Sequence, residues 1–418
     1  PELLGKIFEN LLASYNEETA TTARKATGSF YTPREIVDYM VKESLKEYFK
    51  EKLPILTQEE LNNLLSPSDE ELELEENKKR EIIKAIYELK IIDPACGSGA
   101  FPMGILHKLV HILQKIDPDN KLWAEFVLDK SIEELKRLGQ SEDKEKIVKD
   151  IEEVFNENLN YPDYGRKLYL IENCIYGVDK QPIATQISRL RFFISLVIDQ
   201  KVDKNNPNNY GILPLPNLET NFISADTLLN LEKPLQGNFF ESEELKKLKK
   251  KLIELRHRYF RIKDRSSKLG LQKKDKEIRE KIKELLVKNS WQEVEAKKVA
   301  DFDIFDQNSW ADWFDSEYMF GISEGFDIVI GNPPYVRQEK IVDIKKKLKS
   351  YEVYTSTADL YVYFYEKGIK LLKERGILSY ITSNKWLRAK YGEKLRDYLK
   401  NYKVLKIIDF GGYRVFEQ

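Results

Sequence analysis

The sequence predicts an α/β fold with a mostly parallel sheet, and two observations support that class. Short apolar runs of strand-like composition recur along the chain, and segments with apolar residues at helical spacing separate them. This alternation is typical of parallel strands joined by right-handed crossovers. The expected strands are residues 90–92, 174–178, 220–223, 326–330, 377–382 and 404–410. The expected helices are 33–49, one from Phe101 on, further helices to about Ile171, and 181–198, 359–373 and 391–399.

An N-terminal helical segment is expected in residues 1–88. Apolar residues within 1–22 fall on one stripe at helical spacing, so a helix is predicted there. A second helix is predicted at 33–49, because the stretch TPRE that begins at Thr32 has the form of a capping box. In that interpretation Thr32 is the N-cap, a proline takes the first helical position, and Glu35 lies three residues after the cap.

The sheet is expected in two parts, residues 89–240 and 311–418, with helical insertions at 102–172 and 241–310. The second insertion is interpreted as a helical hairpin with a break at 266–270. Residues 241–300 carry 20 Lys and Arg against 11 Asp and Glu, a local net charge of +9. Either these helices are solvated, or they form a basic arm that lies against a phosphate backbone.

The composition excludes several classes of protein. With 418 residues, the chain is long enough for two or three structural units. Its 69 Lys and Arg nearly cancel its 70 Asp and Glu, so a nucleic-acid partner would have to meet a local basic surface. Two cysteines without metal-type spacing and three histidines argue against a metal site and a disulfide scaffold. No apolar run is long enough to span a membrane, so a cytoplasmic protein is expected.

An acid follows each of the first three predicted strands, where parallel sheets place their ligands. The first acid is Asp93 in DPACGSGAF, where Gly97 and Gly99 let the backbone turn sharply and approach a ligand closely. A dinucleotide-binding loop would need a third glycine where Pro102 stands, so binding of a pyrophosphate is disfavoured.

The other two acids suit the polar groups of a nucleoside. Asp179 in YGVDKQPIA could accept hydrogen bonds from a ribose diol, and Asp226 in FISADTL could accept one from an adenine amine. Each acid taken singly is more readily explained as a helix N-cap. Three acids at three strand ends favour a ligand site.

The fourth predicted strand ends in Asn332-Pro333-Pro334-Tyr335. Prolines donate no N–H and force the preceding residue out of the helical region, so this turn is a stiff extended elbow. It would aim the Asn332 side-chain oxygen and the Pro333 carbonyl at one point, with Tyr335 as a stacking surface. Two acceptors beside a flat wall suit a planar group that bears an NH2. Accepting both hydrogens would favour a nitrogen lone pair that can attack the methyl group of a sulfonium, through positioning and preorganised dipoles without a metal.

These residues resemble the amino-group DNA methyltransferases that modify adenine. GSFYTP at residues 28–33 is similar to the most N-terminal cofactor motif of that family, DPACGSGAF to its first strand motif, and NPPY to its catalytic motif. The order of the motifs resembles the gamma arrangement. Residues 379–396 and 407–418 further resemble the type IIG restriction-modification enzymes and related phage-defence methyltransferases.

The resemblance implies a Rossmann-like fold of the S-adenosylmethionine-dependent methyltransferase type and a double-stranded DNA partner with a flipped adenine. Flipping costs a few kcal/mol, which contacts to flanking DNA would have to supply. The implied cofactor-binding residues are Tyr31, Thr32, Asp93, Ala95, Cys96, Gly97, Gly99, Asp179 and Asp226. The implied catalytic residues are Asn332, Pro333, Pro334 and Tyr335, with Asp359 and Tyr361 as weaker candidates beside the pocket.

The chain departs from the family at both ends. Compared with the family, we expect no nuclease-like segment before residue 1, and neither the last catalytic strand nor the target-recognition domain after Gln418. We therefore expect a fragment that binds cofactor but methylates DNA weakly or not at all, with nuclease and target-recognition domains possible outside it. Two alternatives stay open. One is a methyltransferase acting on protein glutamine amides, and the other is a non-catalytic module that binds DNA or a partner.

Overall fold

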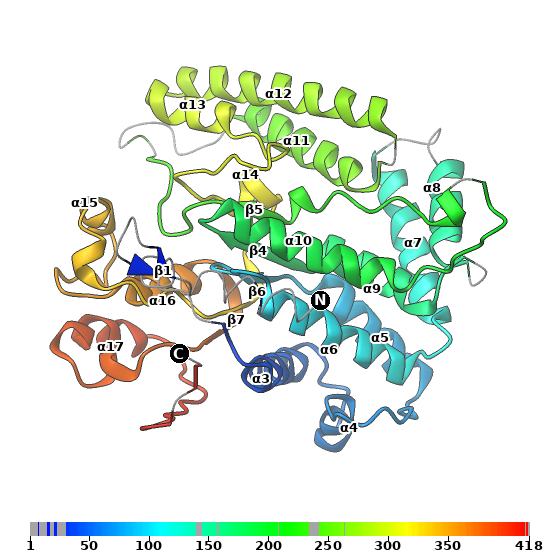
Figure 1. Ribbon diagram of the computed structural model, residues 1–418, viewed down its shortest axis with the longest axis horizontal. Coiled ribbons are helices and arrows are strands. Elements are labelled where there is room, and N and C mark those ends of the chain that lie inside the picture. The colour runs from blue at the N-terminus through cyan, green and yellow to red at the C-terminus, as the bar shows by residue number, and fades with distance from the viewer. Residues whose placement is uncertain are drawn as a thin grey trace.

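The computed structural model has a central sheet with helices packed on both faces (Figure 1). The structure describes residues 7, 15–16, 21–22, 31–138, 144–156, 159–207, 209–232, 234, 242–262, 264–413 and 415–416. In the view of Figure 1, α12 and α13 lie on one side of the sheet and α3 and α6 on the other. This arrangement confirms the predicted α/β class.

The sheet has five parallel strands in the order β5-β4-β3-β6-β7. The strands are β3 (Ile91–Asp93), β4 (Ile175–Asp179), β5 (Phe222–Ser224), β6 (Phe326–Gly331) and β7 (Leu372–Tyr380). Asp93 pairs with Gly177, Asp179 with Ser224, and Gly331 with Tyr380. Because all strands run the same way, their carboxyl ends meet at one edge of the sheet. An all-parallel sheet of this kind is consistent with a Rossmann-like methyltransferase fold.

Fifteen helices of the described residues surround the sheet. They are α3 (Arg34–Lys52), α4 (Gln58–Leu64), α5 (Glu76–Glu88), α6 (Ala100–Ile116), α7 (Lys121–Leu138), α8 (Lys144–Val154), α9 (Pro162–Asn173), α10 (Pro182–Val197), α11 (Glu243–Arg261), α12 (Arg265–Lys288), α13 (Glu293–Asp301), α14 (Ser316–Phe320), α15 (Lys345–Leu348), α16 (Leu360–Lys370) and α17 (Glu393–Leu399). Successive strand residues point to opposite faces, so Ile91 belongs to a hydrophobic cluster that includes residues of α3, α6 and α9, while Ile92 belongs to one that includes residues of α11, α12 and α13. Strands β3 to β6 are therefore buried on both sides, which is why they are apolar runs without polar alternation, whereas β7 at the edge of the sheet is partly exposed.

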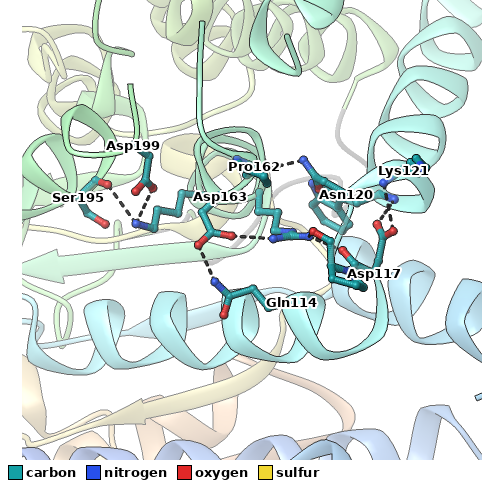
Figure 2. Close-up of polar contacts among 12 residues, drawn as sticks. Gln114, Asp117, Asn120, Lys121, Pro162, Asp163, Ser195 and Asp199 are labelled. Atoms are coloured by element: carbon teal, nitrogen blue, oxygen red, sulfur yellow. Dashed lines mark hydrogen bonds and ion pairs between the residues drawn. The ribbon is translucent and has the colours of Figure 1, made fainter. Parts of the chain in front are cut away.

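A buried polar network ties the helices between β3 and β4 to one another (Figure 2). Arg166 on α9 is 1% exposed and bonds Asp163 at 2.7 Å and the carbonyl oxygens of Asp117 and Pro118. The Asp117 carboxylate in turn accepts a hydrogen bond from the backbone N–H of Trp123 at 2.9 Å and so caps the start of α7. These contacts fix α7 against α6 and α9.

The N-terminal prediction is wrong in two respects. Within the predicted helix 1–22, Ile7 is helical, but Tyr15–Asn16 (β1) and Thr21–Thr22 (β2) form antiparallel strands, and the other residues lie outside the described ones. The predicted capping box does not form, because α3 begins at Arg34 with Pro33 as an N-cap that makes no side-chain bond. The Thr32 hydroxyl instead accepts a hydrogen bond from the Asn332 side chain.

The insertion at residues 241–310, which we call the basic insertion, contains three helices (α11, α12 and α13) and not a hairpin of two. The predicted break at 266–270 is wrong, because α12 begins at Arg265 and continues through Gly270. Asp264 caps α12 by accepting the Ser267 N–H at 2.7 Å, so the serines belong to the first helical turn. A further turn at Ser290, with φ of 66°, leads into α13.

The prediction for the C-terminal part is wrong about one strand and misplaces the start of another. Residues 404–410 were expected as a strand, but they are irregular and exposed, and the five-stranded sheet ends at β7. Strand β7 begins at Leu372, five residues before the predicted start at 377, and a register shift between Phe326 and Ile328 accommodates the extra residues. Arg375 there has φ of 61°.

Among the described residues, none of the helices could cross a membrane and no group of His, Cys, Asp or Glu could hold a metal ion.

Candidate functional site

The loops after four neighbouring strands meet at the carboxyl edge of the sheet. Asp93 ends β3, Asp179 ends β4, Asp226 follows β5, and Asn332 follows β6. This is the edge at which open parallel sheets bind ligands. The predicted site residues thus come from segments that are up to 300 residues apart in the chain.

The glycine-rich loop after β3 is held against β4. The Gly97 N–H donates to Asp179 Oδ2 at 3.0 Å, and the Cys96 N–H donates to the Val178 carbonyl at 2.9 Å. Gly99 has φ of 81°, and a Cβ there would lie 2.6 Å from the Ser188 hydroxyl. Only glycine allows the loop both this conformation and this approach to α10.

Asp93 is a buried carboxyl group at the centre of the site. It is 1% exposed, and burial together with the Asp179 carboxylate holds its pKa well above the usual range, although the Ala95 N–H donates to it at 3.1 Å. A Cβ on Gly331 would lie 2.5 Å from Asp93 Oδ1. The missing side chain of Gly331 therefore lets the end of β6 pass directly beside Asp93.

Burial also shifts the two neighbouring groups. It raises the pKa of Asp179, against the hydrogen bonds that its carboxylate accepts from the Gln181 and Gly97 N–H groups. It raises the pKa of the Cys96 thiol, and the two carboxylates raise it further. The thiol therefore stays protonated near neutral pH and is poorly suited to act as a nucleophile.

Asp226 is engaged by a lysine that the sequence interpretation overlooked. Its Oδ2 lies 3.1 Å from the ammonium of Lys180, the residue directly after Asp179, and its Oδ1 accepts the Leu228 N–H at 3.3 Å. Thr227 donates to the Pro94 carbonyl at 2.6 Å and so joins the loop after β5 to the loop after β3.

Thr32 holds the Asn332 side chain in one orientation. Asn332 Nδ2 donates to Thr32 Oγ1 at 3.2 Å, and Thr32 is 3% exposed. With its nitrogen at Thr32, the amide directs its oxygen to the opposite side. The residue Tyr31, also predicted at the site, precedes Thr32 and is half-buried.

Aromatic rings surround Tyr335. Its hydroxyl donates to the Ile381 carbonyl at 3.2 Å, and burial raises its pKa. Its ring centroid lies 6.1 Å from that of Tyr361, the weaker sequence candidate, and 5.9 Å from that of Phe416 in an edge-to-face contact. Phe416 was not predicted as a site residue, and its only signal in the sequence was its place in a stretch of family resemblance.

The remaining weak candidate, Asp359, supports the loop after Tyr335. It precedes α16, and its Oδ1 accepts the Gln338 N–H at 3.2 Å. A cavity of about 210 Å³ elsewhere on α16 is lined by Lys367, Lys370 and neighbouring residues and includes none of the predicted site residues.

Comparisons with known proteins point to one family. The Eco57I restriction-modification methylase family matches residues 173–416. The chain is 26% identical, over 485 aligned positions, to the putative type II restriction enzyme and methyltransferase RM.MjaORFECS2P of Methanocaldococcus jannaschii, covering 100% of the chain and 36% of that protein. It is 47% identical over 95 residues to the type II methyltransferase M.BstVI of Geobacillus stearothermophilus, covering 22% of the chain and 17% of that protein.

A third relative also matches nearly the whole chain. The adenine-specific methyltransferase BrxX of Escherichia coli O9:H4 (strain HS) is 22% identical over 414 residues, covering 94% of the chain and 29% of that protein. The chain thus spans about a third of the length of the two relatives that match nearly all of it. Because the family match covers more than half of its residues, the chain belongs to the Eco57I restriction-modification methylase family.

Proposed function

We propose that the chain transfers a methyl group from S-adenosylmethionine to the N6-amino group of adenine in double-stranded DNA. One observation carries most of the weight: Thr32 orients the Asn332 amide at the end of β6, beside the buried carboxyl group of Asp93. The names of the relatives, which include restriction enzymes and methyltransferases, favour DNA over a protein glutamine as the substrate.

The strand-end residues fit the proposed cofactor. S-adenosylmethionine carries a cationic sulfonium and ammonium, a ribose diol and an exocyclic amine, all of which suit carboxylates. Both oxygens of Asp179 already accept a backbone N–H, but each retains a lone pair for a ribose hydroxyl. Gly97, with φ of 52°, and Gly99 provide a loop without side chains for close approach of a ligand. When bound, the cofactor would supply an electrophilic methyl group.

The residues of the chain would position the other reactant. The Asn332 side-chain oxygen and the Pro333 carbonyl would accept the two hydrogens of the adenine amine and so concentrate lone-pair density on its nitrogen. Tyr335 would stack on the base, and Phe416, which contacts the Tyr335 ring, would close the pocket from the side. Holding the two reactants in line would account for most of the rate.

Single-turnover transfer of a labelled methyl group to unmethylated genomic DNA tests this proposal at high enzyme concentration. Asn332→Ala should lower the rate by about 100-fold or more, as removal of a preorganised catalytic dipole does. Thr32→Val should lower it by only about 2- to 12-fold, the worth of one hydrogen bond. Thr57→Val removes a matched hydroxyl, which caps α4 by accepting the Glu60 N–H, and should retain the wild-type rate.

Two controls define the product. DNA whose adenines already carry an N6-methyl group should accept no label, and a glutamine-bearing protein in place of DNA should remain unlabelled. Label on the protein, or an unchanged rate in Asn332→Ala, would contradict the proposal.

A further inference from the structure

An exposed tryptophan lies beside the acid that follows β5. Ala311 pairs in parallel with Ala225: its N–H donates to the Ser224 carbonyl at 2.9 Å, and its carbonyl accepts the Asp226 N–H at 2.8 Å. Trp310, immediately before Ala311, is therefore fixed at the carboxyl edge of the sheet. Its side chain is 47% exposed and belongs to none of the hydrophobic clusters of the described residues.

The backbone that carries Trp310 is anchored a second time. Gln186 on α10 donates to the Gln307 carbonyl at 2.8 Å. The segment 307–311 is thus held by α10 on one side and by the end of β5 on the other. The indole is therefore exposed on a rigid segment at the edge where the strand-end loops meet.

Lys180 lies between Trp310 and Asp226. Its ammonium is 3.1 Å from Asp226 Oδ2 and 5.6 Å from the centroid of the Trp310 ring. The lysine side chain is 58% exposed and the Asp226 side chain 9% exposed, so the ammonium is open to solvent while the carboxylate that it pairs with is largely buried. The exposed ammonium can move into solvent when another donor takes its place at the Asp226 carboxylate.

We propose that Trp310 is a stacking wall for the adenine ring of the nucleoside cofactor and that Lys180 is a gate over that position. This inference rests on the proposed function. The Asp226 carboxylate and the indole face together present an acceptor beside a flat aromatic surface, which matches the amine and the ring of adenine. The Lys180 ammonium contacts both the Asp226 carboxylate and the Trp310 ring, so adenine that binds there displaces the ammonium from both.

The proposal predicts a specific pattern of affinities for S-adenosylhomocysteine, measured by titration calorimetry. Trp310→Ala should weaken binding by about 5- to 100-fold, as loss of base stacking does, whereas Trp310→Phe should weaken it by only a few-fold. Lys180→Met should bind at least as tightly as the wild type, because it removes the competing ammonium. Binding of S-adenosylhomocysteine should quench the tryptophan fluorescence of the wild type, and Trp310→Phe should abolish this quenching.

A second exposed aromatic provides the matched control. Tyr161 is 53% exposed and has the ammonium of Lys201 at 5.1 Å from its ring centroid, but it lies at the start of α9, away from the strand-end loops. Tyr161→Ala should bind the ligand as the wild type does. Urea unfolding should give the same midpoint for wild type and Trp310→Ala, because the indole packs in no core cluster.

The outcomes separate this inference from the function on which it rests. If the wild type binds S-adenosylhomocysteine and Trp310→Ala binds it within twofold of the same affinity, the stacking wall is wrong while the proposed function stands. A Lys180→Met affinity far below that of the wild type would overturn the gate. If the wild type fails to bind at all, both proposals are overturned.

Discussion

At the scale of the residue, Asp93 shows how the site and the stability of the fold oppose each other. A carboxyl group that is 1% exposed and faces a second carboxylate lies where burial disfavours its charge. A core that served stability alone would place an apolar or neutral residue there. The site needs the charge if a cationic ligand is to bind, and functional positions commonly carry such a cost.

We therefore predict that Asp93→Asn stabilises the ligand-free protein near neutral pH and weakens S-adenosylhomocysteine binding. The pKa of Asp93 is higher in the folded than in the unfolded protein, so its contribution to the free energy of unfolding falls as pH rises between these two values. The stability advantage of Asp93→Asn should accordingly be absent below the unfolded pKa of about 3.9 and should grow with pH above it. Urea unfolding at several pH values measures this difference.

Glu60→Gln provides a control of opposite sign. The Lys78 ammonium holds the pKa of Glu60 below its usual value, so that carboxylate contributes stability above its unfolded pKa and loses it as pH falls through the folded value. Glu60→Gln should therefore be the less stable protein near neutral pH and equal to the wild type in strong acid. A stability difference for Asp93→Asn that does not change with pH would contradict our account of the buried carboxyl.

Thr32 marks the limit of local sequence interpretation at this scale. The residue types and spacing of a capping box are all present, yet the hydroxyl bonds Asn332, 300 residues away, and α3 starts without a side-chain cap. A four-residue pattern shows which local hydrogen bond is possible. It carries no information about a distant donor that competes for the same oxygen. The strand-end acids were predictable for the opposite reason, because strand order alone brings them to one edge.

At the scale of the element, the basic insertion shows why charge counting is incomplete. The net charge of +9 in residues 241–300 was compatible with all of its cations lying on a surface that could contact phosphate. Two of its cations, Arg256 and Arg279, are instead buried on Asp275, at 2.8 and 2.6 Å. Arg256 also donates to the Tyr318 carbonyl at 2.8 Å, which ties the insertion to α14. Contact of the remaining exposed lysines with DNA stays a prediction.

The buried triad of Asp275, Arg256 and Arg279 leads to a prediction about the basic insertion. Asp275→Ala should destabilise the protein by about 3–5 kcal/mol, because it leaves two guanidinium groups buried without their shared carboxylate. Glu243→Ala removes the partner of Lys246 from an exposed pair on α11 and should leave the urea midpoint unchanged. Equal unfolding midpoints for Asp275→Ala and wild type would show that the insertion tolerates the loss and that the triad does not fix it.

Strands were predictable from sequence only where the fold provided a neighbour for them. Strands β3 to β6 are apolar runs buried on both faces, and their composition was sufficient to find them. The edge strand β7 is only partly buried, and just its second half was predicted. Residues 404–410 have the same composition but no ladder partner among the described residues. A strand requires hydrogen bonds from another segment, and propensity does not reveal whether one is present.

At the scale of the whole molecule, residues 404–410 form an exposed apolar surface, which we call the 404–410 segment. Five of its seven side chains are apolar and 40–59% exposed: Val404, Leu405, Ile407, Ile408 and Phe410. The segment is held in place, since Lys406 bonds Glu43 and Tyr39 of α3 and Asn384 bonds Asp409 at 3.0 Å. Fixed in place and apolar, it has the properties of an aggregation-prone sequence.

We predict that the 404–410 segment drives concentration-dependent self-association of the chain. Replacing Leu405 and Ile407 together with lysine should abolish the larger species in sedimentation velocity, because two charges interrupt the apolar run and repel a second copy. Val294→Lys is the matched control, since Val294 is 68% exposed but stands alone on α13. It adds a positive charge without touching the segment and should leave association unchanged. Wild-type protein that stays monomeric at the highest soluble concentration, or an equal effect of Val294→Lys, would refute the role of this segment and leave net charge as the controlling property.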